Sequence, residues 1–399
     1  MKISCNQQNL SKTLSIVSRA LGSRQLPILE NILITADPVA KTITCVATNL
    51  EIAIKMTMAA EITSTPEAVS KQVLLPGKQL NDIVHSFSSG RVAQVEINTT
   101  ESGASIKCGK STFKLPVAPV AEFPEVKEPS GDSFTVPIQP FLTAVKQTIY
   151  ATDPKDNRQF AQCILFDIED TVATGGVKQL ALVGTDTSRL VIKKLSIENG
   201  FNAQIMIPAN LLRKMVDVVA GTKIKFYISN NQLFAILDNA GSSFLDSQSY
   251  ISVRLMNCQY PRYQQVIPKD LAGQMIINRA EFIRVLERAE LIDQKIKVEM
   301  VWDNLNGSNA ALSISCIADD KTSQFQEGVE INKHSGEPQF LNGFNAKFLL
   351  DFLKSITSDT VELNYMGVEK PILMHGDGDE SLRYIVMPIR LPETQNAAA

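Results

Sequence analysis

The stretch LVGTDTSRLVI, residues 182–192, sets four polar side chains between two apolar runs: Thr185, Asp186, Ser188 and Arg189. A hydroxyl beside a carboxylate becomes a nucleophile when a general base lies within hydrogen-bond reach, and histidine fills that role most often. The chain has three histidines, and none lies near this stretch or within a motif. The residues alone therefore favour a local hydrogen-bonded turn, and we predict no catalytic residue.

Other familiar chemistry is also missing from the sequence. The six cysteines are scattered, with no CxxC pair and no histidine cluster, so we predict reduced, mostly buried thiols and no metal site. No glycine-rich phosphate loop occurs, and we predict no cofactor. The alternative from the enzyme class is a hydrolase or nuclease acting on DNA. It would need carboxylates grouped around a divalent metal, and the scattered acids provide no strong candidate.

Length and charge narrow the class of protein. With 399 residues, 44% of them apolar, the chain can bury several cores and suggests two or three domains. The net charge of −3 gives no sign of a generally basic nucleic-acid binder. The start, MKISCNQQNL, lacks the apolar core of a signal peptide, and no apolar run approaches the roughly 20 residues that span a bilayer. We therefore predict a cytoplasmic protein without a membrane partner.

The elements that position the 182–192 stretch follow a repeated pattern. Three segments follow short strands and carry apolar residues at the helical period: QNLSKTLSIVSRAL from about residue 8, QPFLTAVKQTIYAT from about 139 and RAEFIRVLERAELI from about 279. A second set consists of PGKQLNDIVHSF from Pro76, PANLLRKMVDVV from Pro208 and NAKFLLDFLKSI from Asn345. We predict both prolines in the first helical turn, where a missing N–H costs nothing, and Asn345 as a capping residue.

Alternating strands follow the second set of helices, at VAQVEI from 92, KIKFYI from 223 and VELNY from 361. The pattern predicts an α+β fold of three similar domains, each with two helices packed on antiparallel sheets. Proline-rich linkers around 117–132 and 257–270 place the domains at 1–128, 129–262 and 263–391, with a tail at 392–399. A purely structural repeat array without a ligand is a second alternative.

The charge distribution argues against a purely structural array. The six predicted helices together carry more lysine and arginine than aspartate and glutamate, whereas the rest of the chain is net acidic. Several of the basic residues lie off the apolar stripes and should face water, among them Lys12, Lys146, Arg213 and Lys347. The third segment, with its three glutamates, departs from the trend. The helices are therefore the positive layer of the protein.

Together with the threefold repeat, a series of motifs closely resembles the bacterial sliding clamp family, the beta subunit of DNA polymerase III. The motifs are LPIL at 26–29, FPEV at 123–126, GTDTSRLVI at 184–192, YPRYQQVIPK at 260–269, GFNAKFLLDFL at 343–353 and YIVMPIRL at 384–391. The resemblance covers essentially the whole chain, with the same order and spacing. It implies three DNA-clamp domains per chain and a six-domain ring formed by a head-to-tail homodimer.

The resemblance also implies a function. The ring would encircle duplex DNA without reading its sequence and act as a processivity factor, not as an enzyme. A weakly positive lining suits that role, because phosphate attraction is independent of sequence. The implied partners are the DNA polymerase III alpha subunit, the clamp loader delta subunit, and other polymerases and repair proteins that carry QLxLF-type peptides.

By the same resemblance, the 182–192 stretch forms one wall of a peptide-binding groove between the second and third domains. Such a site should be an apolar pocket with few polar groups. The implied groove residues are Arg158, Ala161, Thr185, Thr187, Ser188, Arg189, Leu190, Pro261, Gln265, Val266, Ile296, Asn345, Phe348, Ile385, Val386, Met387, Pro388, Ile389, Arg390 and Leu391.

Two further sets of residues come from the resemblance. Contact with DNA is implied for Arg24, Lys155, Gln159 and Phe160. Ring closure is implied for Lys110 and Phe113 of one subunit against Leu291 and Ile292 of the other. Both sets are expectations about surfaces that meet another molecule.

Overall fold

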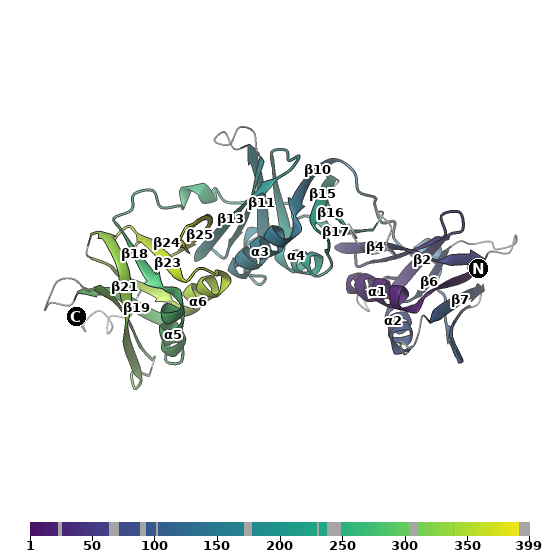
Figure 1. The fold of residues 1–399 in the computed structure, drawn as a ribbon, viewed down its shortest axis with the longest axis horizontal. Helices are drawn as coiled ribbons and strands as arrows, with labels where there is room; N and C mark the ends of the chain where they lie inside the picture. Colours follow the sequence, from purple (N-terminus) through teal and green to yellow (C-terminus); the bar gives the residue numbers. More distant parts are fainter. Residues whose placement is uncertain are drawn as a thin grey trace. The chain divides into compact units, whose positions relative to one another are not determined.

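A computed structural model shows the arrangement of these elements (Figure 1). The structure describes residues 1–22, 26–63, 72–87, 93–100, 103–170, 178–229, 231–237, 249–302, 310–318, 320–337 and 339–390. Two of the predicted site residues, Arg24 and Leu391, lie outside this part of the chain.

The order of strands and helices repeats three times along the chain, as the sequence predicts. The first repeat has helices α1 (Gln7–Val17) and α2 (Gly77–Ser86). Its strands are β1 (Lys2–Asn6), β2 (Asn31–Asp37), β3 (Thr42–Thr48), β4 (Ile52–Ala59), β5 (Glu61–Thr63), β6 (Gln72–Pro76), β7 (Gln94–Thr100), β8 (Gly103–Cys108) and β9 (Ser111–Leu115).

The second and third repeats have the same order. The second has helices α3 (Ile138–Thr148) and α4 (Ala209–Val216), and strands β10 (Asp132–Pro137), β11 (Cys163–Asp170), β12 (Lys178–Thr185), β13 (Arg189–Ile197), β14 (Ala203–Pro208), β15 (Lys223–Ser229), β16 (Gln232–Ile236) and β17 (Tyr250–Arg254). The third has helices α5 (Arg279–Glu290) and α6 (Ala346–Ser355), and strands β18 (Gly273–Asn278), β19 (Lys295–Trp302), β20 (Ala310–Ile317), β21 (Gln324–Gly336), β22 (Leu341–Asn345), β23 (Thr360–Tyr365), β24 (Ile372–Gly376) and β25 (Asp379–Val386).

The helices begin at the predicted places, and three of them begin in the same way. Asn6, Asn278 and Asn345 each end a strand, and each side chain accepts a hydrogen bond from a backbone N–H of the following helix. This satisfies a donor that the first turn would otherwise leave unpaired, and it confirms the predicted cap at Asn345. The prediction for the two prolines was wrong by one position, because Pro76 and Pro208 are the last residues of β6 and β14. Pro76 pairs with Asn31 of β2.

The predicted apolar stripes form the contacts between helices and sheets. Leu10, Leu14 and Val17 of α1 are fully buried, whereas Leu142 and Ile292 at other predicted stripe positions are half-buried. In the third repeat, α5 and α6 lie side by side on one face of the strands (Figure 1).

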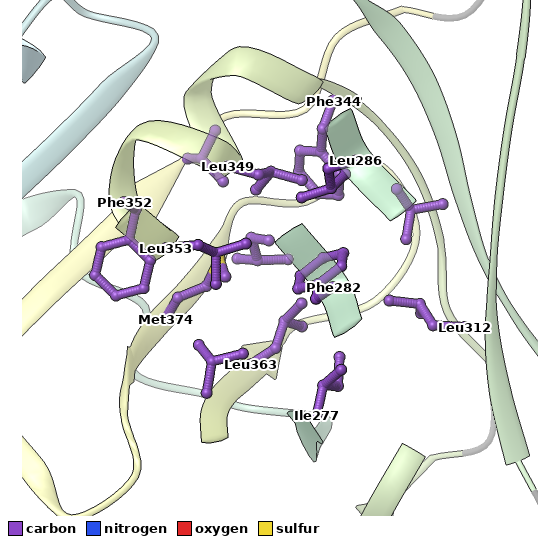
Figure 2. Close-up of a cluster of buried hydrophobic side chains, with 14 of the residues drawn as sticks. Ile277, Phe282, Leu286, Leu312, Phe344, Leu349, Phe352, Leu353, Leu363 and Met374 are labelled. Atoms are coloured by element: carbon purple, nitrogen blue, oxygen red, sulfur yellow. The ribbon is translucent and has the colours of Figure 1, made fainter. Parts of the chain in front are cut away.

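The core of the third repeat shows how this packing is built. Figure 2 shows Phe282 and Leu286 of α5 and Leu349, Phe352 and Leu353 of α6 facing side chains from the strands. Burying each such side chain contributes about 1.5–3 kcal/mol relative to leaving it in water. The helices are therefore held by their apolar faces, which leaves their polar faces available.

All strand pairings between described residues are antiparallel, and they form sheets of five, eight and twelve strands. The larger sheets arise because strands of successive repeats pair. β4 pairs with β17, and β13 pairs with β25.

By its contacts the chain divides into two compact units. Unit 1 contains Met1–Gln139, Ile197–Phe201 and Asn210–Met256, and unit 2 contains Pro140–Ser196, Asn202–Ala209 and Asn257–Ala399.

The cysteines provide a test of the packing. All six are free, and burial raises the pKa of Cys5, Cys45 and Cys163 to about 12. Because the thiolate is the reactive form, we expect these three to resist iodoacetamide at pH 8, while the half-buried Cys108 is alkylated. Mass spectrometry of the labelled protein measures this, and unfolding in guanidinium chloride should make all six react. Labelling of Cys45 as fast as Cys108 would contradict the packing of β3.

Candidate functional site

An apolar pocket lies where the 182–192 stretch, the linker after residue 257 and the last strand meet in unit 2. Its volume is about 190 Å³. The apolar pocket is lined by Phe160, Thr185, Thr187, Arg189, Leu190, Tyr260, Pro261, Tyr263, Val266, Ile385 and Met387. Most of these side chains are apolar or aromatic, so the pocket suits an apolar guest held by few polar groups.

The turn between β12 and β13 forms the first wall of the apolar pocket. Asp186 Oδ1 accepts hydrogen bonds from the backbone N–H groups of Ser188 and Arg189, both at 3.0 Å. Thr185 Oγ1 accepts from Thr187 N and donates to Arg189 O at 2.6 Å. Thr187 has a φ of 75°, a value that L-residues adopt only when the surroundings fix it. The local cap that the residues alone predicted is therefore present.

Arg189 is held on all sides by the protein. Nε donates to Asp186 Oδ2 at 2.8 Å, and one terminal nitrogen donates to Asp351 Oδ2 of α6 at 2.6 Å. The other terminal nitrogen donates to Tyr150 O at 2.8 Å. The guanidinium carbon also lies 4.3 Å from the centre of the Phe348 ring and 5.5 Å from that of Tyr150. We refer to Asp186, Arg189, Asp351, Tyr150 and Phe348 as the Arg189 cluster.

The charge of Arg189 is stabilised although its side chain is only 8% exposed. Burial by itself would lower the pKa of Arg189. The nearby Tyr384 and the carboxylates of Asp351 and Asp186 outweigh that effect and raise the pKa above its usual value. The guanidinium is therefore a charged link between β13 and α6. The N–H groups of Arg189 already donate to partners within the chain. Arg189 therefore presents the flat face of its guanidinium to the pocket and is not a cation free to form a new ion pair.

Two tyrosines fix the linker that forms the second wall. Tyr260 packs edge-on against Phe160, with 6.0 Å between ring centres, and donates to Val183 O at 3.3 Å. Tyr263 donates to the buried carboxylate of Asp167 at 2.8 Å. Burial, together with this hydrogen bond, raises the pKa of Tyr263, so the phenol stays protonated and keeps donating. These contacts hold Pro261 and Val266 at the mouth of the pocket.

The end of β25 and the residues after it form the third wall. Leu190 pairs with Ile385 in the β13–β25 ladder, and Met387 N donates to Ser188 O at 2.9 Å. Ile389 N donates to Gly343 O, also at 2.9 Å. Met387 is 39% exposed, so part of its side chain is free to contact a guest.

The structure brings together eight of the residues that the resemblance assigned to the groove. Thr185, Thr187, Arg189, Leu190, Pro261, Val266, Ile385 and Met387 all line the apolar pocket. Phe160, which the resemblance assigned to DNA, lines it too. Tyr260 and Tyr263 were not predicted, although both stand in the quoted YPRYQQVIPK motif.

Other predicted groove residues lie elsewhere. Ala161, Ile296 and Val386 are buried in the core, so their side chains do not reach the pocket surface. Asn345 caps α6, and Phe348 stacks beneath Arg189. Ser188, Gln265, Pro388, Ile389, Arg390 and Arg158 do not line the cavity itself. Arg158 is exposed and forms an ion pair with Asp156 at 2.6 Å.

The residues predicted to meet DNA or a second subunit are at the surface where the structure describes them. Lys155 and Gln159 are exposed. Lys110 is exposed, Phe113 is 39% exposed on β9, and Ile292 is half-buried. Leu291, just after α5, is 83% exposed. An isolated leucine in water is unremarkable on its own, but here it follows a helix whose large apolar residues Phe282, Val285 and Leu286 are buried.

Within the part of the chain that the structure describes, no group of three or more His, Cys, Asp or Glu side chains is arranged to hold a metal ion. The helices of that part are all too short or too polar to cross a bilayer. The polar groups of the 182–192 stretch bond to one another, to the backbone and to Asp351, with no histidine among them. The site has the chemistry of a binding pocket.

Comparison with known proteins identifies the family. The family model for the N-terminal domain of the DNA polymerase III beta subunit matches residues 1–127, and the model for its C-terminal domain matches residues 264–390. Together these two matches cover more than half of the chain. A curated beta sliding clamp from Synechococcus elongatus is 26% identical over 398 residues, 98% of this chain and 100% of the relative. One from Streptomyces coelicolor is 25% identical over 407 residues, with the same coverage.

The fold agrees with these matches. The crystal structure of the DNA polymerase III subunit beta from Pseudomonas aeruginosa superposes with a TM-score of 0.85 at 20% identity, covering 98% of this chain and 100% of that one. At this identity the likeness shows the sliding-clamp fold, and the sequence matches above show the family. The chain therefore belongs to the DNA polymerase III beta subunit family and is a sliding clamp, a non-catalytic processivity factor for DNA polymerase.

Proposed function

We propose that the apolar pocket is the docking site through which this clamp holds its partner proteins, and that two copies close into a ring around duplex DNA. The partners would be the DNA polymerase III alpha subunit, the clamp loader delta subunit, and other polymerases and repair proteins, working in the cytoplasm. The observation that carries the proposal is the apolar pocket itself, with the exposed Met387 at its mouth.

The shape and chemistry of the pocket define what it would take. A cavity of about 190 Å³ accommodates one or two bulky apolar side chains, and Leu190, Val266 and Ile385 provide apolar contacts for them. A short extended peptide of the QLxLF type offers such side chains. An affinity near 1 μM, about −8 kcal/mol, would let partners exchange on one clamp.

A single substitution tests the docking site. Met387→Ala should weaken binding of a fluorescein-labelled Gln-Leu-Ser-Leu-Phe peptide about tenfold, because truncating an apolar contact at the mouth of the pocket should cost about 1.4 kcal/mol. Fluorescence anisotropy measures the dissociation constant. Leu271→Ala is the matched control, since Leu271 is 44% exposed against 39% for Met387 and does not line the pocket. Equal peptide binding by the two variants and the unmodified chain would refute the assignment.

The proposal of a ring rests on how the sheets join within the chain. β4 pairs with the last strand of the second repeat, and β13 pairs with the last strand of the third. By position in the repeat, the corresponding strands are β21 and β9. Residues 324–330 of β21 pair with β20 and with no other described strand, while residues 331–336 pair with β18. Among the described strands, β9 pairs with β8 alone and ends its sheet. A second copy would supply the missing neighbour to each, as in a head-to-tail dimer.

Side chains near these two edges are complementary in charge and character. Lys110 and Lys114 are exposed at β9, and Glu330 is exposed on β21. The exposed Phe113 and Leu291 provide apolar surface for the same contact. Because two such contacts close the ring, each needs only moderate strength to keep it shut.

The proposal for DNA rests on the polar faces of the helices. Lys146 of α3, Arg213 of α4 and Lys347 of α6 are exposed, as are Lys155 and Gln159 beyond α3. Such cations attract phosphates without reading bases. At physiological salt the attraction acts over about 8 Å, so it would guide the duplex without trapping it.

Ion pairs within the chain moderate that charge. Lys354 lies 2.7 Å from Glu287, and Arg288 forms a two-pronged pair with Glu327. The basic residues of α5 and α6 are therefore partly neutralised. Retention on DNA would come from ring closure and not from strong binding.

A further inference from the structure

A second, polar cavity of about 120 Å³ lies on the same sheet of unit 2 as the apolar pocket. Its lining includes Asp167, Glu169, Gln179, Lys194, Tyr263 and Arg383. These side chains come from β11, β12, β13, β25 and the linker.

The two cavities lie next to each other along the paired strands β13 and β25. Leu190 and Ile385 are paired residues of the apolar pocket, and Ile192 and Arg383, the next pair on the same face, belong to the polar cavity. Alternate residues of a strand are about 7 Å apart. Tyr263 lines both cavities. An extended peptide with a side chain in the apolar pocket therefore reaches the polar cavity with the side chain two residues away.

The charged side chains of the polar cavity differ in whether they have partners within the chain. Asp167 is buried and accepts hydrogen bonds from Tyr263 at 2.8 Å and Gln204 at 3.2 Å. Among the described residues, Lys194 and Arg383 form no ion pair within 4 Å. Glu169, the remaining acid, is on β11, two strands or about 10 Å from β13. Asp167 is thus already bonded within the chain, whereas Arg383 and Lys194 have no ion-pair partner among the described residues.

We propose that the polar cavity extends the docking site and selects peptides that carry a carboxylate two residues from the apolar anchor, with Arg383 and Lys194 as its partners. The proposal rests on the proposed function of the apolar pocket. A planar guanidinium suits carboxylate recognition, and the half-buried position of Arg383 reduces the screening by water. The selected partners would carry an acidic residue beside the docking sequence at one end.

Peptide binding to the full chain tests this selection. The reference is Gln-Leu-Ser-Leu-Phe, and the test peptides add Gly-Glu, Gly-Gln or Gly-Lys after it, or a single Glu, Gln or Lys before it, so that each added side chain lies two residues from an apolar anchor. At one end only, we expect the glutamate peptide to bind about fivefold more tightly than the glutamine peptide, the upper range for a partly exposed ion pair. The lysine peptide should bind more weakly than both. In 0.5 M NaCl the preference should shrink, because exposed charges are screened.

Substitutions in the cavity assign the effect to its residues. Arg383→Gln should remove the preference for glutamate and leave the affinity for the reference peptide unchanged. Lys194→Gln, at an exposed residue whose loss leaves the packing intact, should reduce the preference in part. Lys370→Gln removes an equal charge from the exposed turn between β23 and β24 and should leave the preference intact. Thermal melts of all three variants check that they are folded.

The outcomes separate this inference from the docking site on which it rests. Equal binding of glutamate, glutamine and lysine peptides at both ends, with normal binding of the reference peptide, overturns the selection and leaves the docking site standing. A preference that survives in Arg383→Gln and Lys194→Gln also overturns it. If the reference peptide does not bind, the docking site itself is refuted, and the selection of acidic peptides is refuted with it.

Discussion

Replacing Asp351 with alanine is expected to destabilise the contact between β13 and α6 by about 3 kcal/mol, the lower end of the cost of breaking a buried ion pair. Asp351 is the partner of Arg189 that comes from α6, at 2.6 Å. Its loss leaves the buried guanidinium with one carboxylate, from Asp186, in place of two. The lower end of the range applies because that second pair persists.

Native-state hydrogen exchange is the appropriate measurement. A protein with several repeats need not unfold in one step, so a single melting temperature would mix several transitions. Exchange of backbone amides in β13 and α6 reports the local opening free energy, and a change of about 3 kcal/mol speeds it roughly a hundredfold. The peptide affinity should fall as well, because Arg189 and Leu190 line the apolar pocket.

Two further variants test whether the change in exchange comes from the ion pair between Arg189 and Asp351. Arg158→Gln removes an ion pair that is exposed, with Asp156, and should leave exchange in β13 unchanged. In the double variant Arg189→Met with Asp351→Leu, apolar groups replace both charges, and the loss should be smaller than the sum of the single losses. Unaltered exchange in Asp351→Ala would show that the Arg189 cluster does not hold α6 to β13.

Periodicity was enough to predict the helices and the threefold repeat, because each helix buries one stripe of apolar residues. Phe282, Leu286 and Ala289 of α5 illustrate this, since all three are buried at helical spacing. The joins between repeats were not predicted. Val253 of β17 pairs with Ile52 of β4, and Val386 of β25 pairs with Arg189 of β13, each about 200 residues away. A local pattern indicates that a strand exists but not which distant strand it pairs with.

The site was predicted in part for a similar reason. The residues alone indicated the turn capped by Asp186, because both partners of that cap are within three positions. They gave no sign that Arg189 would reach Asp351, which lies on a helix of the next repeat. The resemblance added Pro261 and Met387 to the site, and both line the pocket. It also included Ile296, whose place in the core depends on packing that no motif encodes.

Replacing Leu291 and Ile292 with aspartate is expected to convert the proposed dimer into monomers of 43.8 kDa. Leu291 is 83% exposed, and it follows α5 at the edge where we propose that a second copy binds. Two carboxylates in an apolar contact would be desolvated without partners, which costs several kcal/mol for each ion. Because a ring has two such contacts, the cost applies twice. Light scattering coupled to size exclusion measures the mass directly.

Two controls separate loss of the contact from loss of the fold. Val368 is 48% exposed in the turn between β23 and β24, away from the proposed contact, and Val368→Asp adds a carboxylate to another exposed apolar position. It should leave the dimer intact. The variant with both aspartates should keep its binding of the Gln-Leu-Ser-Leu-Phe peptide, since neither position lines the apolar pocket. A dimer mass in that variant would place the subunit contact elsewhere. Monomers that still bind peptide would instead show that ring closure depends on the end of α5. They would also show that unit 2 binds peptide without a second copy of the chain.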